Sequence, residues 1–481
     1  MIRFFRRLWK DRRGNALVIG AACMPLVIAA AGLASDTIQW TLWKRQLQRA
    51  ADSAAIAGVY DRSNHSGDTS TVAATVTHDL TLNLHTFYGV KSGYPIVSYP
   101  ADTGVQQDQV KVTLAIQQKL PFSSMFMTAA PTIIVNATAA SIPAGGDACV
   151  EALETTSTTG VTFIGNTDVY MPDCDIFSNS SGTNVTVGKG SANVTANSVG
   201  GVGGIQESNN FHVTGYRPYS PALPDPFSGV DVDPNDMHCA VTSSTSTQTV
   251  VVVDSPATGH YVTHGNHQVW VQDTAAVTHT ETQTIVTNTP LALTGNDNIM
   301  TMKDASGNQA NCFTALSVGS NKALSIPDTY TGPIYINGGD ANLQGNFSCK
   351  ACTIVLTNKD AASPIGNITS NASANINITA PTDGKFKGLA IYQDRRAADC
   401  SNCNKVNGNS ASIITGAIYF PSQELQYNGT GTTDATCTMF VARRVTFSGN
   451  NGTTNKFKKL ADCSSEGLPS NATTRIVRLV A

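Results

Sequence analysis

The hydropathy pattern begins with an uncharged apolar run at residues 16–34. Its 19 residues are long enough to cross the roughly 30 Å hydrocarbon layer of a bilayer as an α-helix. A cleavable signal peptide is the alternative, because the small residues at 29–35 could form a cleavage site. However, the run is longer than the roughly 7–15 apolar residues of such a peptide. We therefore expect an uncleaved transmembrane helix at residues 16–34.

Beyond this span, apolar residues recur at three- and four-residue spacing as far as Gly58. The periodicity predicts that the helix continues out of the membrane with one apolar face. Many residues on that face are small, and small residues allow a second helix to approach closely. Packing beneath the protein's own strands is the alternative. The candidates for contact with a partner helix are Asp36, Ala50, Ala51, Asp52, Ala54, Ala55 and Gly58.

Residues 35–145 combine this helix with shorter elements. Mixed helical periodicity at 70–88 indicates a short helix, and alternation of apolar with polar residues predicts strands at 109–117 and 132–138. A long helix followed by a few antiparallel strands is a pilin-like α+β arrangement. Pro and Gly at 143–146 then predict a linker.

From residue 146 to 481 the helical period is lost and a short strand pattern takes over. Apolar triplets such as Val161–Phe163 and Ile418–Phe420 alternate with Gly and Asn turns, often about 20 residues apart. Strands this short with turns this frequent favour a parallel β-helix, a solenoid in which Asn tolerates the corner conformation. A β-sandwich array is the alternative. The spacing is irregular around 205–320, where we expect an insertion. The predicted fold class is therefore mainly β.

The charges indicate an orientation for the predicted span. Residues 1–13 hold six cations and one anion, whereas the rest of the chain holds 25 cations and 33 anions. The positive-inside rule therefore places residues 1–15 in the cytoplasm and the bulk of the chain on the other side. The acidic remainder argues against a nucleic-acid partner.

Eleven cysteines divide unevenly along the chain. Cys23 lies in the apolar span, and the other ten all follow residue 148, which favours disulfides formed in an oxidising compartment. Bonds within a CxxC pair and bonds between rungs both remain open. Two CxxC pairs with 47 residues between them offer zinc as an alternative, although that gap exceeds the usual roughly 15–20 residues. The disulfide candidates are Cys149, Cys174, Cys239, Cys312, Cys349, Cys352, Cys400, Cys403, Cys437 and Cys463.

Two polar clusters are candidates for chemistry. The first cluster consists of His260, His264 and His267. Their imidazoles could bind Zn²⁺ or Cu²⁺, but the glutamate of an HExxH motif is missing. The second cluster consists of Asp394, Arg395, Arg396 and Asp399. It could supply acid and base groups to a glycan-degrading β-helix, although salt bridges at the end of a strand explain it more simply. We expect no catalytic residue, no cofactor and no metal site.

The segment RRGNALVIGAACMPLVIAAAGLASDTIQWTLWKRQLQRAADSAAIAG at residues 12–58 closely resembles the N-terminal region of TadE/TadG-like proteins of the Flp (Tad) pilus assembly system. An Arg-Arg-Gly-Asn start, an Asp after the span and a Leu-Gln-x-Ala-Ala-Asp-x-Ala-Ala-x-Ala-Gly ending carry the resemblance. TadE-like pseudopilins are cut after a Gly with a Glu five residues on, and Ile19 occupies that place after Gly14. The resemblance therefore implies the TadG-like branch, which keeps its anchor.

This resemblance implies a non-enzymatic structural or assembly component of a Flp-type pilus, held in a bacterial inner membrane by a single span. It also implies contacts with membrane lipid, with minor pilins and with other pilus-assembly proteins through a periplasmic ectodomain. A protein of another class would fit the ectodomain pattern too: a membrane-anchored β-helical glycan-binding protein or polysaccharide-degrading enzyme.

Overall fold

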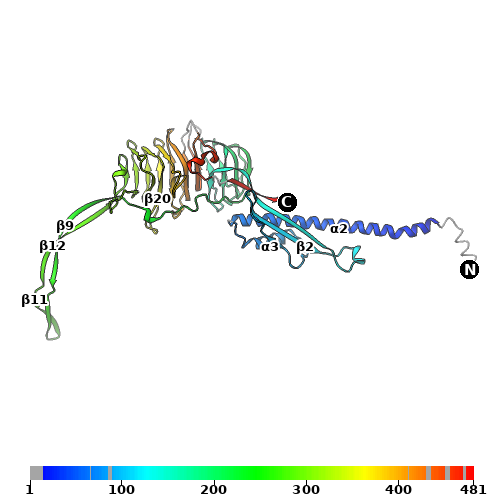
Figure 1. Cartoon of the computed structure of the whole chain (residues 1–481), viewed down its shortest axis with the longest axis horizontal. Coiled ribbons are helices and arrows are strands. Elements are labelled where there is room, and N and C mark those ends of the chain that lie inside the picture. Colours follow the sequence, from blue (N-terminus) through cyan, green and yellow to red (C-terminus); the bar gives the residue numbers. More distant parts are fainter. Residues whose placement is uncertain are drawn as a thin grey trace, which may run out of the picture.

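A computed structural model describes residues 15–65, 67–84, 89–409, 411–428, 435–449, 455–469 and 473–480. The chain is mainly β, with a parallel β-helix as its largest part, as the strand pattern predicted. The molecule is elongated: a long helix lies at one end, the β-helix in the middle and a β-ribbon at the other end (Figure 1). Most of the basic segment predicted at residues 1–15 lies outside the described residues.

Helix α2 spans Asn15–Asn64 without interruption and includes Pro25. At 1.5 Å per residue its 50 residues extend about 75 Å. The helix is long and apolar enough at its N-terminal end to cross a membrane, and no residue in its most apolar stretch is buried inside the protein. The periodic segment that follows the span is therefore a direct continuation of the same helix, as predicted.

A membrane-proximal module packs against the second half of α2. Helix α3 (Val72–Asn83) and strands β1 (Ile96–Ser98), β2 (Gln107–Gln117), β3 (Thr132–Ala152) and β28 (Thr473–Val480) complete it. The four strands form an antiparallel sheet in the order β1-β2-β3-β28. Alternate residues of β2 and β3 bury apolar side chains against the two helices, which forms a core of its own. The predicted short helix and both predicted strands are present.

The linker predicted at 143–146 is instead part of the continuous 21-residue strand β3. The glycines there serve close packing rather than flexibility: a Cβ at Gly145 would overlap the side chains of Arg217 and Asp175. Pro143 pairs with Arg475 of β28. The same strand thus belongs to the antiparallel sheet at its start and to the β-helix at its end.

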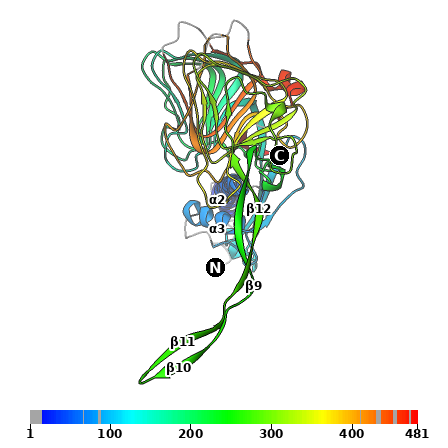
Figure 2. The same cartoon turned by 90° about the vertical axis from the view of Figure 1, so that its left-hand side faces the viewer.

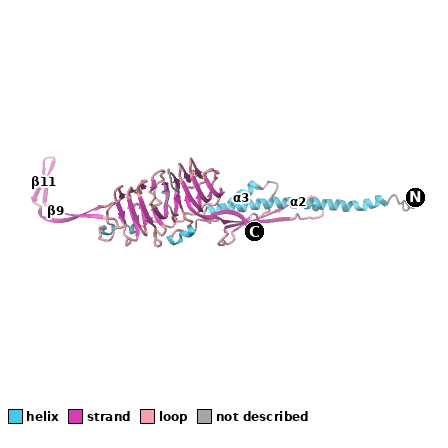
Figure 3. Ribbon diagram, turned by 90° about the horizontal axis from the view of Figure 1, so that it is seen from above, coloured by secondary structure: helices cyan, strands magenta, loops and turns pink. Residues whose placement is uncertain are grey.

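The β-helix is built from many short parallel strands (Figure 3). Their bounds are β4 Val161–Phe163, β5 Asp168–Ser178, β6 Thr186–Gly188, β7 Asn193–Gly201, β8 Phe211–Arg217, β13 Leu293–Thr294, β14 Cys312–Phe313, β15 Leu316–Val318, β16 Ala323–Ser325, β17 Gly332–Asn337, β18 Ala341–Leu343, β19 Asn346–Cys349, β20 Cys352–Thr357, β21 Ile368–Ser370, β22 Asn375–Thr379, β23 Leu389–Gln393, β24 Asn404–Asn407, β25 Ile413–Asn428, β26 Thr438–Phe447 and β27 Asn455–Lys456. Short 3-10 turns lie at η2 Ser123–Met125, η3 Pro234–Asp236, η4 Ile299–Thr301 and η5 Leu460–Glu466.

The strands stack into three faces around one apolar core. The longest face has the order β14-β17-β20-β23-β25-β26-β3-β5-β7-β8. Aromatic rings stack along the interior, with Phe163 and Phe447 parallel at 4.9 Å between ring centroids. Because each rung places equivalent residues above one another, the repeated apolar triplets of the sequence become continuous columns of the core.

The rungs are not stacked in the order of the sequence. Strand β3 enters in the middle, between β26 and β5, and the rungs that follow it build one end of the solenoid as far as β8. Residues 218–240, which we call the strap, then cross the outside of the longest face to the opposite end. From there the rungs return from β13 to β26 and close against β3.

Residues 241–290 form the ribbon that projects from the far end (Figures 1 and 2). Strand β9 (Val241–Ser255) pairs with β12 (Val277–Pro290), and β10 (Thr258–His264) pairs with β11 (His267–Thr274), all antiparallel. The irregular insertion expected around 205–320 is thus narrower, because β8 before it and β13 to β15 after it are regular rungs. The irregular part is the strap followed by the ribbon.

Candidate functional site

The small residues of α2 face the protein's own core. Ala51, Ala54 and Ala55 are fully buried among residues of α3, β2 and β3, and Ala50 is 2% exposed. A Cβ at Gly58 would lie 2.9 Å from Val110 and 3.2 Å from Val76. The intramolecular alternative therefore accounts for this face of the helix, and these positions leave no open surface for a partner helix.

The two acidic candidates on α2 are also engaged within the chain. Asp52 is half-buried and accepts a hydrogen bond from Gln48 at 2.7 Å. Asp36 is buried and accepts hydrogen bonds from the backbone N–H groups of Phe122 and Ser123 and from the Ser123 hydroxyl. Burial disfavours the charged carboxylate, but these hydrogen bonds outweigh that effect, so the pKa of Asp36 lies below its ordinary value. Asp36 thus fixes the loop between β2 and β3 against the helix.

All ten cysteines outside the span form disulfides. Three bonds tie separate parts of the β-helix together: Cys149–Cys174, Cys239–Cys312 and Cys437–Cys463. Two close within a CxxC pair, Cys349–Cys352 and Cys400–Cys403. The zinc alternative for the two CxxC pairs is therefore replaced by two local disulfides. Cys23 in the span has no partner cysteine.

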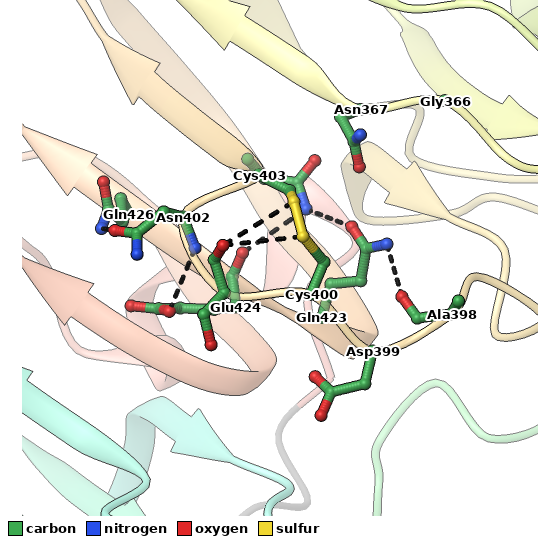
Figure 4. Close-up of a disulfide and its surroundings, with 12 residues drawn as sticks. Gly366, Asn367, Ala398, Asp399, Cys400, Asn402, Cys403, Gln423, Glu424 and Gln426 are labelled. Carbon is green, nitrogen blue, oxygen red and sulfur yellow. Dashed lines mark hydrogen bonds between the residues drawn. A yellow bond between two sulfur atoms is a disulfide. The ribbon is translucent and has the colours of Figure 1, made fainter.

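Figure 4 shows how the Cys400–Cys403 loop is held against the next rung. Asn402 donates its backbone N–H to the carboxylate of Glu424 at 3.3 Å, and the Glu424 N–H donates to the carbonyl of Cys400 at 3.0 Å. Gln423 donates to the carbonyl of Ala398 at 2.6 Å. The disulfide therefore belongs to a turn that is hydrogen-bonded to the neighbouring rung.

The histidine cluster lies at the tip of the ribbon rather than in a pocket. His260 pairs with Asp273 at 2.9 Å across the two strands, and His264 faces His267 at the final turn. His279 lies further down the ribbon between Asp254 and Glu281, which raise its pKa. Within the described part of the chain, no group of three or more His, Cys, Asp or Glu side chains has the arrangement of a metal site.

The charged side chains of the cluster at 394–399 form ion pairs within the protein. Arg396 contacts the buried carboxylate of Asp394 at 2.7 Å. Arg395 reaches outward to Asp231 of the strap at 3.1 Å. Asp399 contacts Arg444 at 2.5 Å. These side chains connect rungs to one another and to the strap, which matches the salt-bridge interpretation of the sequence.

The strap itself is the feature that the sequence pattern least predicted. Asn179 and Leu223 exchange two hydrogen bonds of 2.9 Å at one end of it. In the middle, Tyr419 donates to Asp225 at 2.7 Å. At the far end Cys239 is bonded to Cys312. The strands beneath, such as β20 and β23, are consequently buried on both sides. The short apolar runs inside these strands, 354–356 and 389–392, were the available signal for such a cover.

An open groove of about 650 Å³ lies where the strap meets the membrane-proximal module. Its lining includes Ser63, Asn64, Asp108, Asn179 and Arg475. Arg475 already donates to the hydroxyl and carbonyl of Ser141 and to the carbonyl of Val105. Those contacts lie within the membrane-proximal module, whereas the Tyr60 hydroxyl of α2 donates to the carbonyl of Tyr219 in the strap at 2.6 Å and so connects the two parts.

Comparison with known families gives one result. Residues 14–61 match the family described as Putative Flp pilus-assembly TadE/G-like. No significant match was found among curated proteins or among solved structures. The matched segment covers helix α2 from the start of the apolar span to the buried small residues. We therefore identify residues 14–61 as a TadE/G-like segment, the family that the motif around the span predicted.

Proposed function

We propose that this protein is a non-enzymatic assembly component of a Flp-type pilus system, of the TadG-like branch, anchored in a bacterial inner membrane. Its N-terminus would lie in the cytoplasm, because six cations precede the apolar span. Its β-helix would lie in the periplasm, where the five disulfides form. The match at residues 14–61 supports a role in pilus assembly.

The ribbon at 241–290 is the observation that carries a role in protein–protein contact. An isolated two-stranded ribbon is marginally stable in water, and both of its edges offer unpaired backbone groups. Counting β9 and β10 at about 3.3 Å per residue, it reaches about 70 Å. It projects from the end of the β-helix opposite to the span (Figure 1).

Apolar side chains are exposed along the ribbon. Tyr261 and Trp270 pack edge to face across its strands at 5.0 Å between ring centroids, yet 64% and 49% of their surfaces remain exposed. Val251 and Val253 are also exposed. Exposed apolar groups on an extended edge suit a partner that adds a strand or covers this pair. We assign the ribbon to contact with other pilus-assembly proteins or minor pilins, and the span to contact with lipid.

Removal of the ribbon tests this function. Val241 and Pro290 face each other at its base, so a short Gly-Ser turn can replace 242–289 without displacing the rungs. A second variant replaces only the outer part, 257–275. The full-length protein and both variants are purified from the native host in mild detergent, and the pilus-assembly proteins that accompany each are quantified.

We expect pilus proteins to accompany the intact protein and to be lost when 242–289 are removed. The tip deletion shows whether the outer pair Tyr261 and Trp270 is needed. Unchanged recovery of the same proteins without the ribbon would remove the ribbon from the interface. Absence of pilus proteins from the intact preparation would contradict the proposed system itself.

A further inference from the structure

The loop between β2 and β3 lies beside the apolar span. Figure 1 shows this hairpin running along α2 toward the N-terminal end of the helix. The ring of Phe122 rests on Gly32, and a Cβ at Gly32 would overlap it. Gly32 belongs to the apolar run, two residues before its end. The loop therefore reaches the level at which α2 enters the membrane.

The tip of this loop exposes a group of large apolar side chains. Met125 and Phe126 are each 75% exposed, and Met127 is 53% exposed. No charged residue occurs between Lys119 and Asp147. Three such neighbours on a tip that the chain itself does not cover form an apolar patch continuous with the surface of the span.

The backbone N–H groups of residues 122–127 are already paired without water. The N–H groups of Phe122 and Ser123 donate to Asp36. Those of Ser124, Met125, Phe126 and Met127 donate to the carbonyls of Leu120, Phe122, Ser123 and Ser123, respectively. Six consecutive N–H groups thus have internal acceptors. Non-helical backbone tolerates an apolar environment only when its polar groups are paired in this way.

Two residues of α2 that follow the span indicate where the headgroup layer of the membrane lies. Trp40 and Lys44 follow the span by about two and three turns, respectively, and the Lys44 ammonium lies 5.4 Å from the Trp40 ring centroid. Trp and Lys commonly occupy the headgroup layer at the end of a span. The loop tip lies on the membrane side of this pair, since Phe122 is in contact with Gly32.

We propose that Met125, Phe126 and Met127 insert into the outer leaflet of the same bilayer that α2 crosses, so that the protein holds the membrane at two points. The occupant of the patch is the upper acyl-chain region of the lipid. The second contact orients the membrane-proximal module against the membrane surface, because Asp36 fixes the loop to the helix. A single helix alone would leave rotation about its own axis free.

The test places an environment-sensitive nitrobenzoxadiazole label on the tip of the full-length protein in phosphatidylethanolamine and phosphatidylglycerol vesicles. Cys23→Ser removes the one free thiol of the described residues, and Phe126→Cys provides the labelling site. Val105→Cys is the matched control: Val105 is also an exposed apolar residue, 63% exposed, but its loop lies at the opposite end of β2. Intact disulfides are verified by mass spectrometry.

We expect blue-shifted emission at position 126 and loss of most of that emission when the vesicles contain lipid with a nitroxide near the top of the acyl chain. The label at position 105 should respond to aqueous iodide instead. Equal quenching of both labels by iodide would overturn the insertion. Blue-shifted emission at 126 that nitroxide lipid leaves unchanged would also overturn it, since a protein surface would then cover the tip.

Discussion

Glu151 and Glu154 lie three residues apart in the chain and are both buried, yet their carboxylates have opposite surroundings. Glu154 accepts hydrogen bonds from Arg443 at 3.0 Å and from Arg444 at 2.8 Å. Neither carboxylate oxygen of Glu151 has a hydrogen-bond partner within the part of the chain that the structure describes. The two positions therefore form a matched pair for testing how charge is accommodated where β3 enters the solenoid.

Glu151→Gln should stabilise the protein at neutral pH. Burial, together with the negative charge of Asp225, raises the pKa of Glu151 well above the ordinary carboxyl value. The stability that its protonated form contributes is complete below the ordinary pKa and is lost as pH rises toward the raised pKa. We expect a gain of about 1–3 kcal/mol at pH 7 and a flatter dependence of stability on pH above about 4.5. Thermal unfolding between pH 4 and 8 measures both.

Glu154→Gln should have the opposite effect. Burial alone would raise the pKa of Glu154, but hydrogen bonds from Arg443, Thr156 and Arg444 lower it to about 2. Its contribution to stability is therefore present above the ordinary pKa and is lost as pH falls from about 4.5 toward 2. We expect a loss of about 1–3 kcal/mol at pH 7. The same sign for both glutamine variants at pH 7 would show that their different surroundings do not decide their energetics.

Ala51→Leu should destabilise the membrane-proximal module instead of acting on an interface. The methyl group of Ala51 is fully buried, so added carbon atoms force apart α2 and the elements packed on it. Overpacking of this kind costs about 1–3 kcal/mol. Ala57→Leu, at a half-buried position on the same helix, is the control and should cost less. Unfolding in detergent gives the comparison.

The expectation at Ala51 fails if the leucine variant unfolds like the wild type but no longer co-purifies with pilus-assembly proteins. That result would return this face of α2 to the set of partner contacts.

Removing the Cys239–Cys312 bond should cost more stability than removing Cys349–Cys352. The first bond joins residues 73 positions apart and fixes the end of the strap, whereas the second joins residues three apart. Loop-closure entropy gives about 4 kcal/mol for the long loop and about 2 kcal/mol for the short one. Denaturant unfolding of the two double Cys→Ser variants tests the order. Equal losses would indicate that strain or residual structure outweighs loop length.

Local patterns were sufficient to predict the elements that depend on neighbouring residues. The apolar run at 16–34, the three- and four-residue spacing that follows and the alternation in 109–117 each correspond to an element of the structure. The Gly- and Asn-punctuated triplets predicted a parallel solenoid because each rung repeats the same requirement for buried side chains.

Long-range pairing was not accessible from those patterns. Gly145 and Gly146 read as a linker, and only their contacts with Arg217, Asp175 and Asp173 show that they are a crossing point of tightly packed strands. The partners of the three disulfides that link separate parts of the β-helix depend on which strands lie side by side, and this order does not follow the chain. The role of the small residues of α2 could not be predicted either. A helix buried by its own domain and a helix buried by a partner show the same spacing of apolar residues.

The position of β3 in the solenoid sets an order of events during synthesis. Val150 of β3 must pair with Phe440 of β26, so one edge of the first rung stays open until nearly the whole chain has been made. At roughly 5–20 residues per second this interval is roughly 15–60 s. Throughout it, a strand that is buried in the complete protein has an unpaired edge. The solenoid is therefore completed in its middle, by the pairing of β26 with β3, and not at one of its ends. A chain that stops before β26 would leave this edge of β3 unpaired.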